Sequence, residues 1–320
     1  MHFVTVPNGS VKLNVAVQGE GPLILCVHGW PELWYSWRHQ IAHFSALGYR
    51  VAALDVRGYG GSSKPPGIED YTLRRLASDV VEVATALARP GERTILFGHD
   101  WGAPIVWNTA VLHPKAIRAV AGLSVPFMPA GSESFIDIAR ALYKDRFFYQ
   151  LYFQQEGVAE AEFERDFRTA LRKVYFAASG DAPLNAMLAL KPASAAMLDG
   201  LVDPQPFPAW MSEADLQVFV DAFNAGGFRG PLNRYRAQTL DVAELADIAG
   251  KSVEQPACFI GGAKDPVRAF VPGSDLYADP GAFCRDFRGA TLLPGIGHWV
   301  QQEAPQATNA ALERFVKGLS

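Results

Sequence analysis

Apolar runs and helical repeats alternate along the first part of the chain. Residues 11–18 alternate between apolar and polar side chains, which is typical of a strand with one buried face. Residues 23–27 and 51–54 are continuous apolar runs, as expected for parallel strands that are buried on both faces. Between these runs, large apolar side chains recur at helical spacing over residues 34–47. The pattern therefore predicts two strands joined by a helix.

The same alternation continues toward the middle of the chain. Residues 73–87 predict a helix, residues 94–97 a strand, residues 103–112 a helix and residues 116–123 a further apolar strand. Strands that alternate with helices predict βαβ units and a mostly parallel sheet. Near the start, the Asn-Gly-Ser sequence of residues 8–10 predicts a hairpin turn.

Beyond residue 126 the pattern changes. The chain becomes helix-like and rich in aromatic residues until about residue 236, and several prolines interrupt it. Strand character returns at residues 257–261 and 291–293. Residues 305–319 predict a terminal helix with a proline near its first turn.

These changes predict the division of the chain. We expect residues 1–128 and 237–320 to form one α/β core, and residues 129–236 to form a helical lid inserted between its two parts. The length of 320 residues is large for a single core and is compatible with such an insertion.

Composition indicates a globular protein and gives no sign of a charged partner. The chain is 49% hydrophobic and 19% charged, and its net charge is −4, so it has no basic footprint for nucleic acid or an anionic membrane. No run approaches the ~20 apolar residues of a membrane helix. Three cysteines lack metal-like spacing. We expect a cytoplasmic protein, a monomer or homodimer, with no nucleic-acid, membrane or metal partner.

Residues 98–102 form a G-x-D-x-G run between a predicted strand and a predicted helix. This arrangement resembles the nucleophile elbow of α/β-hydrolases, where the central residue is usually serine. Here Asp100 takes that position. A carboxylate attacks an electrophilic sp3 carbon and forms an alkyl-enzyme ester, so the substitution points to enzymes that open epoxides or displace halides.

Two further residues follow Asp100 in the order that hydrolases use for nucleophile, acid and histidine. Asp265 follows the strand at residues 257–261, and His298 lies in a glycine-rich loop after the last strand. Asp100 must be ionised to attack, so that step needs no base. Hydrolysis of the ester needs a base with a pKa near neutrality, which His298 supplies while Asp265 orients its ring.

The run His28-Gly29-Trp30-Pro31 follows the strand at residues 23–27. In hydrolases this position supplies one backbone N–H of the oxyanion hole, and the residue after the nucleophile supplies the other. We therefore expect Trp30 and Trp101 to stabilise the tetrahedral intermediate that forms when the ester is hydrolysed.

Together these motifs make the chain similar to the soluble type of epoxide hydrolases, whose fold is the α/β-hydrolase fold. The similarity runs from about residue 11 to residue 303. It rests on residues 28–31, on the run DVRGYGGS at residues 55–62, on GHDWGA at residues 98–103 and on GHW at residues 297–299. The resemblance implies conversion of an epoxide to a vicinal diol by water, without metal or organic cofactor.

Two segments of the lid resemble those that carry the two lid tyrosines of this family. Matching residue by residue gives Tyr149 and Tyr235. Ring opening leaves an alkoxide with a high pKa, so the epoxide oxygen needs a donor, and a phenol stays protonated at neutral pH. Arg234 is a departure, because many relatives carry tryptophan just before the second tyrosine. We expect an apolar lining for a small hydrophobic epoxide, with candidate residues Trp101, Phe127, Phe148 and Trp210.

Two alternatives stay open. A haloalkane-type dehalogenase also uses an aspartate and a histidine, but those enzymes resemble a His-Gly-Asn-Pro pattern where this chain has Trp30 before Pro31. Fluoroacetate dehalogenases carry arginine after the nucleophile, where this chain has Trp101. A non-catalytic ligand-binding hydrolase homologue is the second alternative, although each expected catalytic residue is present.

Overall fold

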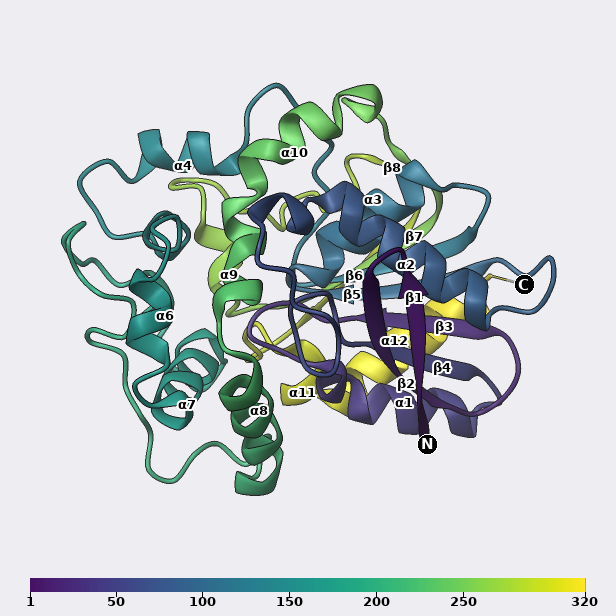
Figure 1. Ribbon diagram of the computed structural model, residues 1–320, viewed down its shortest axis with the longest axis horizontal. Helices are drawn as coiled ribbons and strands as arrows, with labels where there is room; N and C mark the ends of the chain where they lie inside the picture. The colour runs from purple at the N-terminus through teal and green to yellow at the C-terminus, as the bar shows by residue number, and fades with distance from the viewer. Residues whose placement is uncertain (320) are drawn as a thin grey trace.

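The computed structural model describes residues 1–319, which form a single eight-stranded sheet with helices on both faces (Figure 1). The strand order is β1-β2-β4-β3-β5-β6-β7-β8. The strands are β1 (His2–Asn8), β2 (Val11–Gln18), β3 (Leu23–Val27), β4 (Arg50–Leu54), β5 (Thr94–His99), β6 (Ile117–Leu123), β7 (Val253–Gly262) and β8 (Cys284–Leu293). β2 is antiparallel to β1 and β4, and all other neighbours are parallel. The expected mostly parallel sheet is confirmed.

Each central strand divides its side chains between two apolar layers. In β3, Leu25 belongs to the layer that contains helices α2 (Leu73–Leu87) and α3 (Gly102–Leu112). The next residue, Cys26, belongs to the opposite layer with α1 (Arg38–Ala46) and α12 (Pro305–Lys317). Because successive strand residues point to opposite faces and both faces are covered, β3 is apolar throughout.

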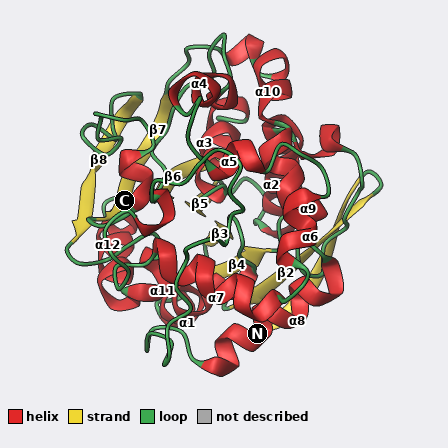
Figure 2. Cartoon of the chain, turned by 90° about the vertical axis from the view of Figure 1, so that its left-hand side faces the viewer, coloured by secondary structure: helices red, strands yellow, loops and turns green. Residues whose placement is uncertain are grey.

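The segment between β6 and β7 is helical. Its helices are α4 (Phe135–Leu142), α5 (Tyr149–Tyr152), α6 (Val158–Phe163), α7 (Phe167–Ala178), α8 (Glu213–Gly226), α9 (Arg229–Arg236) and α10 (Gln238–Glu244). In Figure 2 helices α5, α7 and α9 face the viewer, in front of the central strands. The short helix α11 (Val300–Glu303) follows the last strand and precedes α12. The helical segment between β6 and β7 therefore lies at the end of the sheet where Asp100 follows β5.

Most predicted elements are confirmed, and the difference at β8 has a physical reason. Asn8 pairs with Val11 across the predicted hairpin turn, and α2 has the predicted bounds. Strand β8 begins at Cys284 rather than at residue 291. It is one of the two edge strands, and most of its residues are exposed or half-buried, so residues 284–290 lack an apolar run. Within residues 1–319, the structure has no helix long and apolar enough to cross a membrane.

Candidate active site

A sharp turn between β5 and α3 presents Asp100. Its backbone has a φ of 51°, in the left-handed region that few residues other than glycine and aspartate or asparagine adopt. The flanking glycines allow the strand and helix to approach each other closely. A Cβ at Gly98 would lie 2.3 Å from the carbonyl oxygen of Gly102, and a Cβ at Gly102 would lie 2.0 Å from that of Val27. The G-x-D-x-G run is therefore required by geometry.

The three residues expected to act together meet at this turn. Nε2 of His298 lies 3.2 Å from Oδ2 of Asp100, and Nδ1 of His298 lies 2.9 Å from Oδ2 of Asp265. All three residues are buried. The imidazole thus bridges two carboxylates.

Asp265 is held by two donors besides the histidine. Its Oδ1 accepts the backbone N–H of Val267 at 2.8 Å, at the start of a 3₁₀ turn over Pro266–Ala269. Its Oδ2 accepts the hydroxyl of Tyr277 at 2.7 Å. Tyr277 was not identified from the sequence, because it lies in an irregular stretch between β7 and β8 with no motif around it. These donors fix the carboxylate that orients His298.

The charges at the site are set by this arrangement. Burial opposes ionisation of Asp100, but the hydrogen bond and charge of His298 outweigh it and lower the pKa of the carboxyl below its ordinary value. Burial also opposes protonation of His298, yet Asp265 and Asp100 hold its pKa well above the ordinary histidine value. The site without substrate is therefore a carboxylate beside an imidazolium.

The loop after β3 contributes a donor to the nucleophile. The backbone N–H of Trp30 donates to Oδ1 of Asp100 at 2.6 Å. A Cβ at Gly29 would lie 2.2 Å from the same oxygen and 2.5 Å from the backbone nitrogen of Trp101. Glycine is therefore needed for the two loops to meet here. The other predicted donor, Trp101, lies beside this place, while Trp30 makes the hydrogen bond to Asp100.

A buried network that was not identified from the sequence connects this loop to the histidine. Oε2 of Glu32 accepts the backbone N–H of Gly29 at 3.0 Å and lies 2.6 Å from Nδ1 of His99. Nε2 of His99 lies 2.8 Å from the backbone oxygen of His298, which also accepts the hydroxyl of Ser124 at 2.7 Å. Glu32 and His99 are fully buried, so this network fixes the position of the loop after β3 relative to the loop that carries His298.

The two lid tyrosines lie beside each other near the nucleophile. The rings of Tyr149, at the start of α5, and Tyr235, in α9, have centroids 5.9 Å apart. The ring of Tyr235 also contacts the rings of Trp30 and Trp101. Burial raises the pKa of both phenols, so both hydroxyls stay protonated and able to donate.

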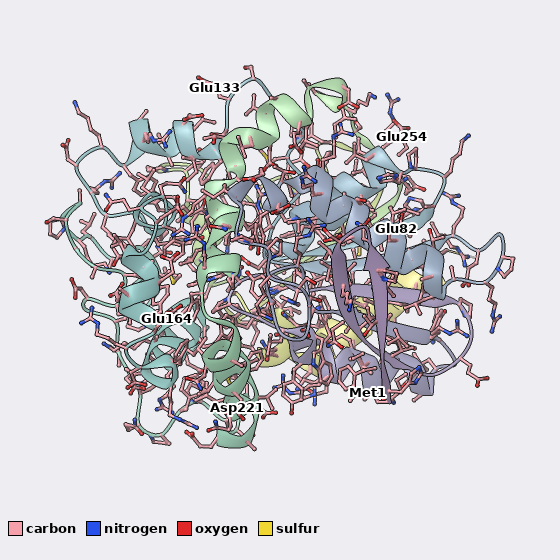
Figure 3. The ribbon with its side chains drawn as sticks, viewed as in Figure 1. Met1, Glu82, Glu133, Glu164, Asp221 and Glu254 are labelled. Carbon is pink, nitrogen blue, oxygen red and sulfur yellow. The ribbon has the colours of Figure 1, made fainter. Side chains whose placement is uncertain are left out.

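A cavity of about 560 Å³ extends from Asp100 to the surface. Trp101, Phe127 and Tyr149 contribute to its lining, together with apolar residues such as Trp107 and Leu276. Glu133 also lines the cavity, and Figure 3 shows it at the outer edge of the molecule.

Two of the residues expected in this lining lie elsewhere. Phe148 is stacked on Tyr143, with ring centroids 4.3 Å apart, and does not line the cavity, whereas the next residue, Tyr149, does. Trp210 donates to Asp181 at 3.0 Å and packs against Phe207. The aromatic character of the lid indicated these residues, but it does not tell which rings face the substrate and which pack among themselves. Within residues 1–319, no group of three or more His, Cys, Asp or Glu side chains is arranged to hold a metal ion.

Comparison with known proteins places this geometry in a family. The alpha/beta hydrolase fold family matches residues 22–268. Epoxide hydrolase A of Mycobacterium tuberculosis is 40% identical over 318 residues, which cover 98% of this chain and 97% of that protein. The structure of an epoxide hydrolase from an endophytic Streptomyces matches with a TM-score of 0.92 at 40% identity, over 99% of this chain and 95% of that one. Potato epoxide hydrolase I matches with a TM-score of 0.88 at 32% identity, over 99% of both chains.

Proposed function

The chain belongs to the epoxide hydrolases of the alpha/beta hydrolase fold, and we propose that it converts an epoxide to a vicinal diol through an ester on Asp100. The observation that carries this proposal is the buried Asp100–His298–Asp265 chain of contacts facing two protonated tyrosines. It combines a carboxylate nucleophile, a base and donors for a leaving oxygen.

In the first step, one carboxylate oxygen of Asp100 attacks a ring carbon and the carbon–oxygen bond of the epoxide breaks. Oδ1 is held by the Trp30 N–H, so Oδ2 is the oxygen that forms the new bond. The ring oxygen takes the electron pair as an alkoxide, and Tyr149 and Tyr235 donate hydrogen bonds to it. One phenol gives its proton to the alkoxide, so this step yields an ester that joins Asp100 to the hydroxylated substrate, and a phenolate that is reprotonated in the next step.

In the second step, the charge change at Asp100 turns His298 into a base. A carboxylate that becomes an ester is neutral, so His298 loses one of the two negative partners that raise its pKa. The imidazolium then gives up its proton to the phenolate left by ring opening, and the neutral imidazole accepts a proton from the water that attacks the ester carbon. The Trp30 N–H stabilises the oxyanion on Oδ1, and we assign Trp101 as the second donor. When the bond between Oδ2 and the carboxyl carbon breaks, His298 gives its proton to Oδ2 and the diol leaves with that oxygen. The new carboxyl group of Asp100 then loses its proton to His298, which restores the carboxylate and the imidazolium.

We propose that residues 129–236 act as the lid and that residues 1–128 and 237–320 form the core. This division is supported by the origin of the site residues: Asp100 and His298 come from loops of the sheet, whereas Tyr149 and Tyr235 come from α5 and α9. Closing the site between two parts excludes bulk water from the ester.

We further propose a cytoplasmic location, without nucleic-acid or membrane partner, as a monomer or homodimer. Cys26, Cys258 and Cys284 are all free, and the first two are buried, which supports a reducing compartment. A small hydrophobic epoxide and water are the proposed reactants, with no metal or organic cofactor.

A direct test supplies purified protein with styrene oxide and, separately, with a haloalkane. The proposal expects phenylethanediol from wild type and no diol above background from Asp100→Asn. The matched control Asp286→Asn, whose side chain pairs with Arg288 at the surface, should retain activity. Halide release without any diol formation would show a dehalogenase instead.

A further inference from the structure

Arg234 is a buried cation in the lining of the catalytic cavity. Its side chain is 2% exposed, and its guanidinium carbon lies 4.7 Å from the centre of the Trp101 ring. Trp101 directly follows the nucleophile and lines the same cavity as Arg234 and Asp100. A guanidinium over an indole face forms a favourable cation–π contact, which fixes the orientation of the guanidinium plane. Arg234 therefore has a defined position beside the reacting residues.

The known partners of Arg234 do not use all of its donors. Nη1 donates to the backbone oxygen of Tyr71 and lies 3.4 Å from Oδ1 of Asp241, while Nη2 donates to Oδ2 of Asp241. A guanidinium has five N–H groups, so these contacts leave the Nε–H and one hydrogen of Nη2. Within residues 1–319, Nε has no hydrogen-bond partner although it is buried. Buried polar donors are normally paired, but Nε is enclosed by protein atoms, so the donor that still needs an acceptor within reach of a ligand is Nη2.

The rest of the cavity does not supply that acceptor. Its lining near the nucleophile is largely apolar, with Trp107, Phe127 and Leu276 among its members. An all-carbon substrate would leave the buried donors of Arg234 unpaired, whereas a substrate oxygen would satisfy one of them. Pairing of a buried donor by a ligand raises affinity and rejects analogues that lack the acceptor.

Asp241 disfavours a negatively charged acceptor on the substrate. It forms an ion pair with Arg234 and also accepts the backbone N–H of Leu73 at 2.7 Å. The pair is neutral as a whole, so a substrate carboxylate would bring an uncompensated negative charge next to Asp241 in a buried place. An uncharged oxygen brings no such penalty.

We propose that Arg234 is a specificity-determining residue, which selects epoxides carrying an uncharged oxygen acceptor, such as an ether, ester carbonyl or hydroxyl, and binds that oxygen through the remaining hydrogen of Nη2. This inference rests on the proposed function and deepens it by naming the class of substrate. The ring is opened at Asp100, and the acceptor is held above Trp101 at Arg234.

The test uses pairs of epoxides that differ by one atom. Benzyl glycidyl ether is compared with its all-carbon analogue, in which a CH₂ group replaces the ether oxygen. Two longer pairs place the oxygen one and two bonds farther from the ring. For each pair the measured quantity is the ratio of kcat/KM for the ether to kcat/KM for the carbon analogue. Within one enzyme preparation this ratio is independent of the fraction of folded protein.

The variant that tests the proposal is Arg234→Met combined with Asp241→Asn. It removes both charges together, which leaves no buried unpaired ion, and the asparagine oxygen still accepts from Leu73. For at least one pair, the ratio should fall by about tenfold to a hundredfold from wild type to this variant, the effect of one hydrogen bond to a charged donor. Arg229→Met with Glu156→Gln is the matched control, because Arg229 lies on the same helix as Arg234 but pairs with Glu156 at the surface. Its ratios should equal those of wild type.

Asp241→Asn alone tests the part played by charge. It keeps Arg234 and removes its counter-ion, so hydrolysis of an epoxide that carries a carboxylate should rise about tenfold or more relative to its methyl ester. An unchanged preference would overturn the claim that Asp241 restricts the acceptor to uncharged groups.

Other outcomes separate this inference from the proposed function. If wild type hydrolyses both members of every pair and the ratios do not change in the double variant, the role of Arg234 is refuted and the epoxide hydrolase function stands. If wild type hydrolyses neither ethers nor carbon analogues nor styrene oxide, the proposed function fails and the inference fails with it.

Discussion

Replacing His298 with glutamine should separate the two chemical steps. Glutamine occupies a similar volume and keeps an amide N–H for the neighbouring carboxylates, but it has no basic nitrogen to accept a proton from water. Asp265 would keep the Val267 N–H and the Tyr277 hydroxyl as donors, so the substitution does not leave a bare buried charge. We therefore expect His298→Gln to fold and to retain the nucleophile.

The expected change in the rate constant of each step follows from the groups that the step requires. General-base catalysis contributes about 10²–10⁴-fold, so the rate constant for ester hydrolysis should fall by that factor, or about 3–5 kcal/mol in activation free energy. Alkylation requires an ionised Asp100 and the hydrogen bonds that Tyr149 and Tyr235 donate to the epoxide oxygen, and the substitution removes none of these groups. The substitution removes the imidazolium that favours ionisation of Asp100, but Oδ1 still accepts the Trp30 N–H at 2.6 Å, so ring opening should slow by less than ester hydrolysis. The ester should then accumulate.

Rapid quenching followed by intact-protein mass spectrometry measures this directly. With excess styrene oxide, the variant should gain the mass of one substrate molecule, and peptide mapping should locate the adduct at Asp100. His43→Gln is a matched control, because this histidine pairs with Glu313 on α12, away from the cavity, and its variant should show wild-type turnover. Turnover by His298→Gln at the wild-type rate, or the absence of any adduct at Asp100, would refute the assigned role of the histidine.

Three further predictions concern the donors, the charges and the elbow. Tyr149→Phe and Tyr235→Phe should each slow the alkylation burst by about 10–10²-fold, and the double variant should slow it further; an undiminished burst in the double variant would remove the phenols from the mechanism. Because the folded pKa of His298 lies well above its unfolded value, its contribution to stability is complete below about pH 6.5 and is lost as pH rises through the folded value. The Tm of wild type should thus fall more steeply above neutral pH than that of His298→Gln, and parallel curves would contradict the ion pair. Gly98→Ala should cost about 1–3 kcal/mol of stability, because the new Cβ would lie 2.3 Å from the Gly102 carbonyl oxygen, whereas Gly131→Ala, with nothing within 4 Å, should be nearly neutral in the same denaturation experiment.

The sheet and the nucleophile turn were predictable because their signals are local. A strand that is buried on both faces must be apolar, as Leu23–Val27 is. Glycine is required at residues 98 and 102 because a Cβ atom at either position would lie only about 2 Å from a backbone oxygen. The edge strand β8 carries no such constraint over residues 284–290, so its start could not be located from the pattern.

The rest of the site depends on contacts between segments that are far apart in the chain. Tyr277 reaches Asp265 across an irregular stretch, and Glu32 reaches His99 from another loop, so neither residue has a periodicity or motif to mark it. The orientation of lid aromatics is likewise a matter of tertiary contacts, which is why Phe148 and Trp210 could not be separated from Phe127 by sequence. The unusual Arg234 was visible in the sequence, but its unpaired Nε and its partner Asp241 became evident only in the fold.

The same contacts explain how a buried carboxylate can remain reactive. Asp100 lies in an environment that by itself opposes ionisation, and the nearby imidazolium and the Trp30 N–H compensate for this. The compensation lasts only until the ester forms. Loss of the charge on Asp100 then lowers the pKa of His298 at the moment when a base is needed, so one change of charge orders the two steps.

The central claim is that oxygen passes from Asp100 to the product, and one labelling measurement tests it most directly. Wild-type enzyme in molar excess over the epoxide is allowed a single turnover in oxygen-18 water, and both the diol and the Asp100 peptide are analysed by mass spectrometry. We predict a diol without label and an Asp100 carboxylate that carries one oxygen-18 atom. A diol that is labelled in this first turnover, with unlabelled Asp100, would show direct attack of water on the epoxide and contradict the ester mechanism.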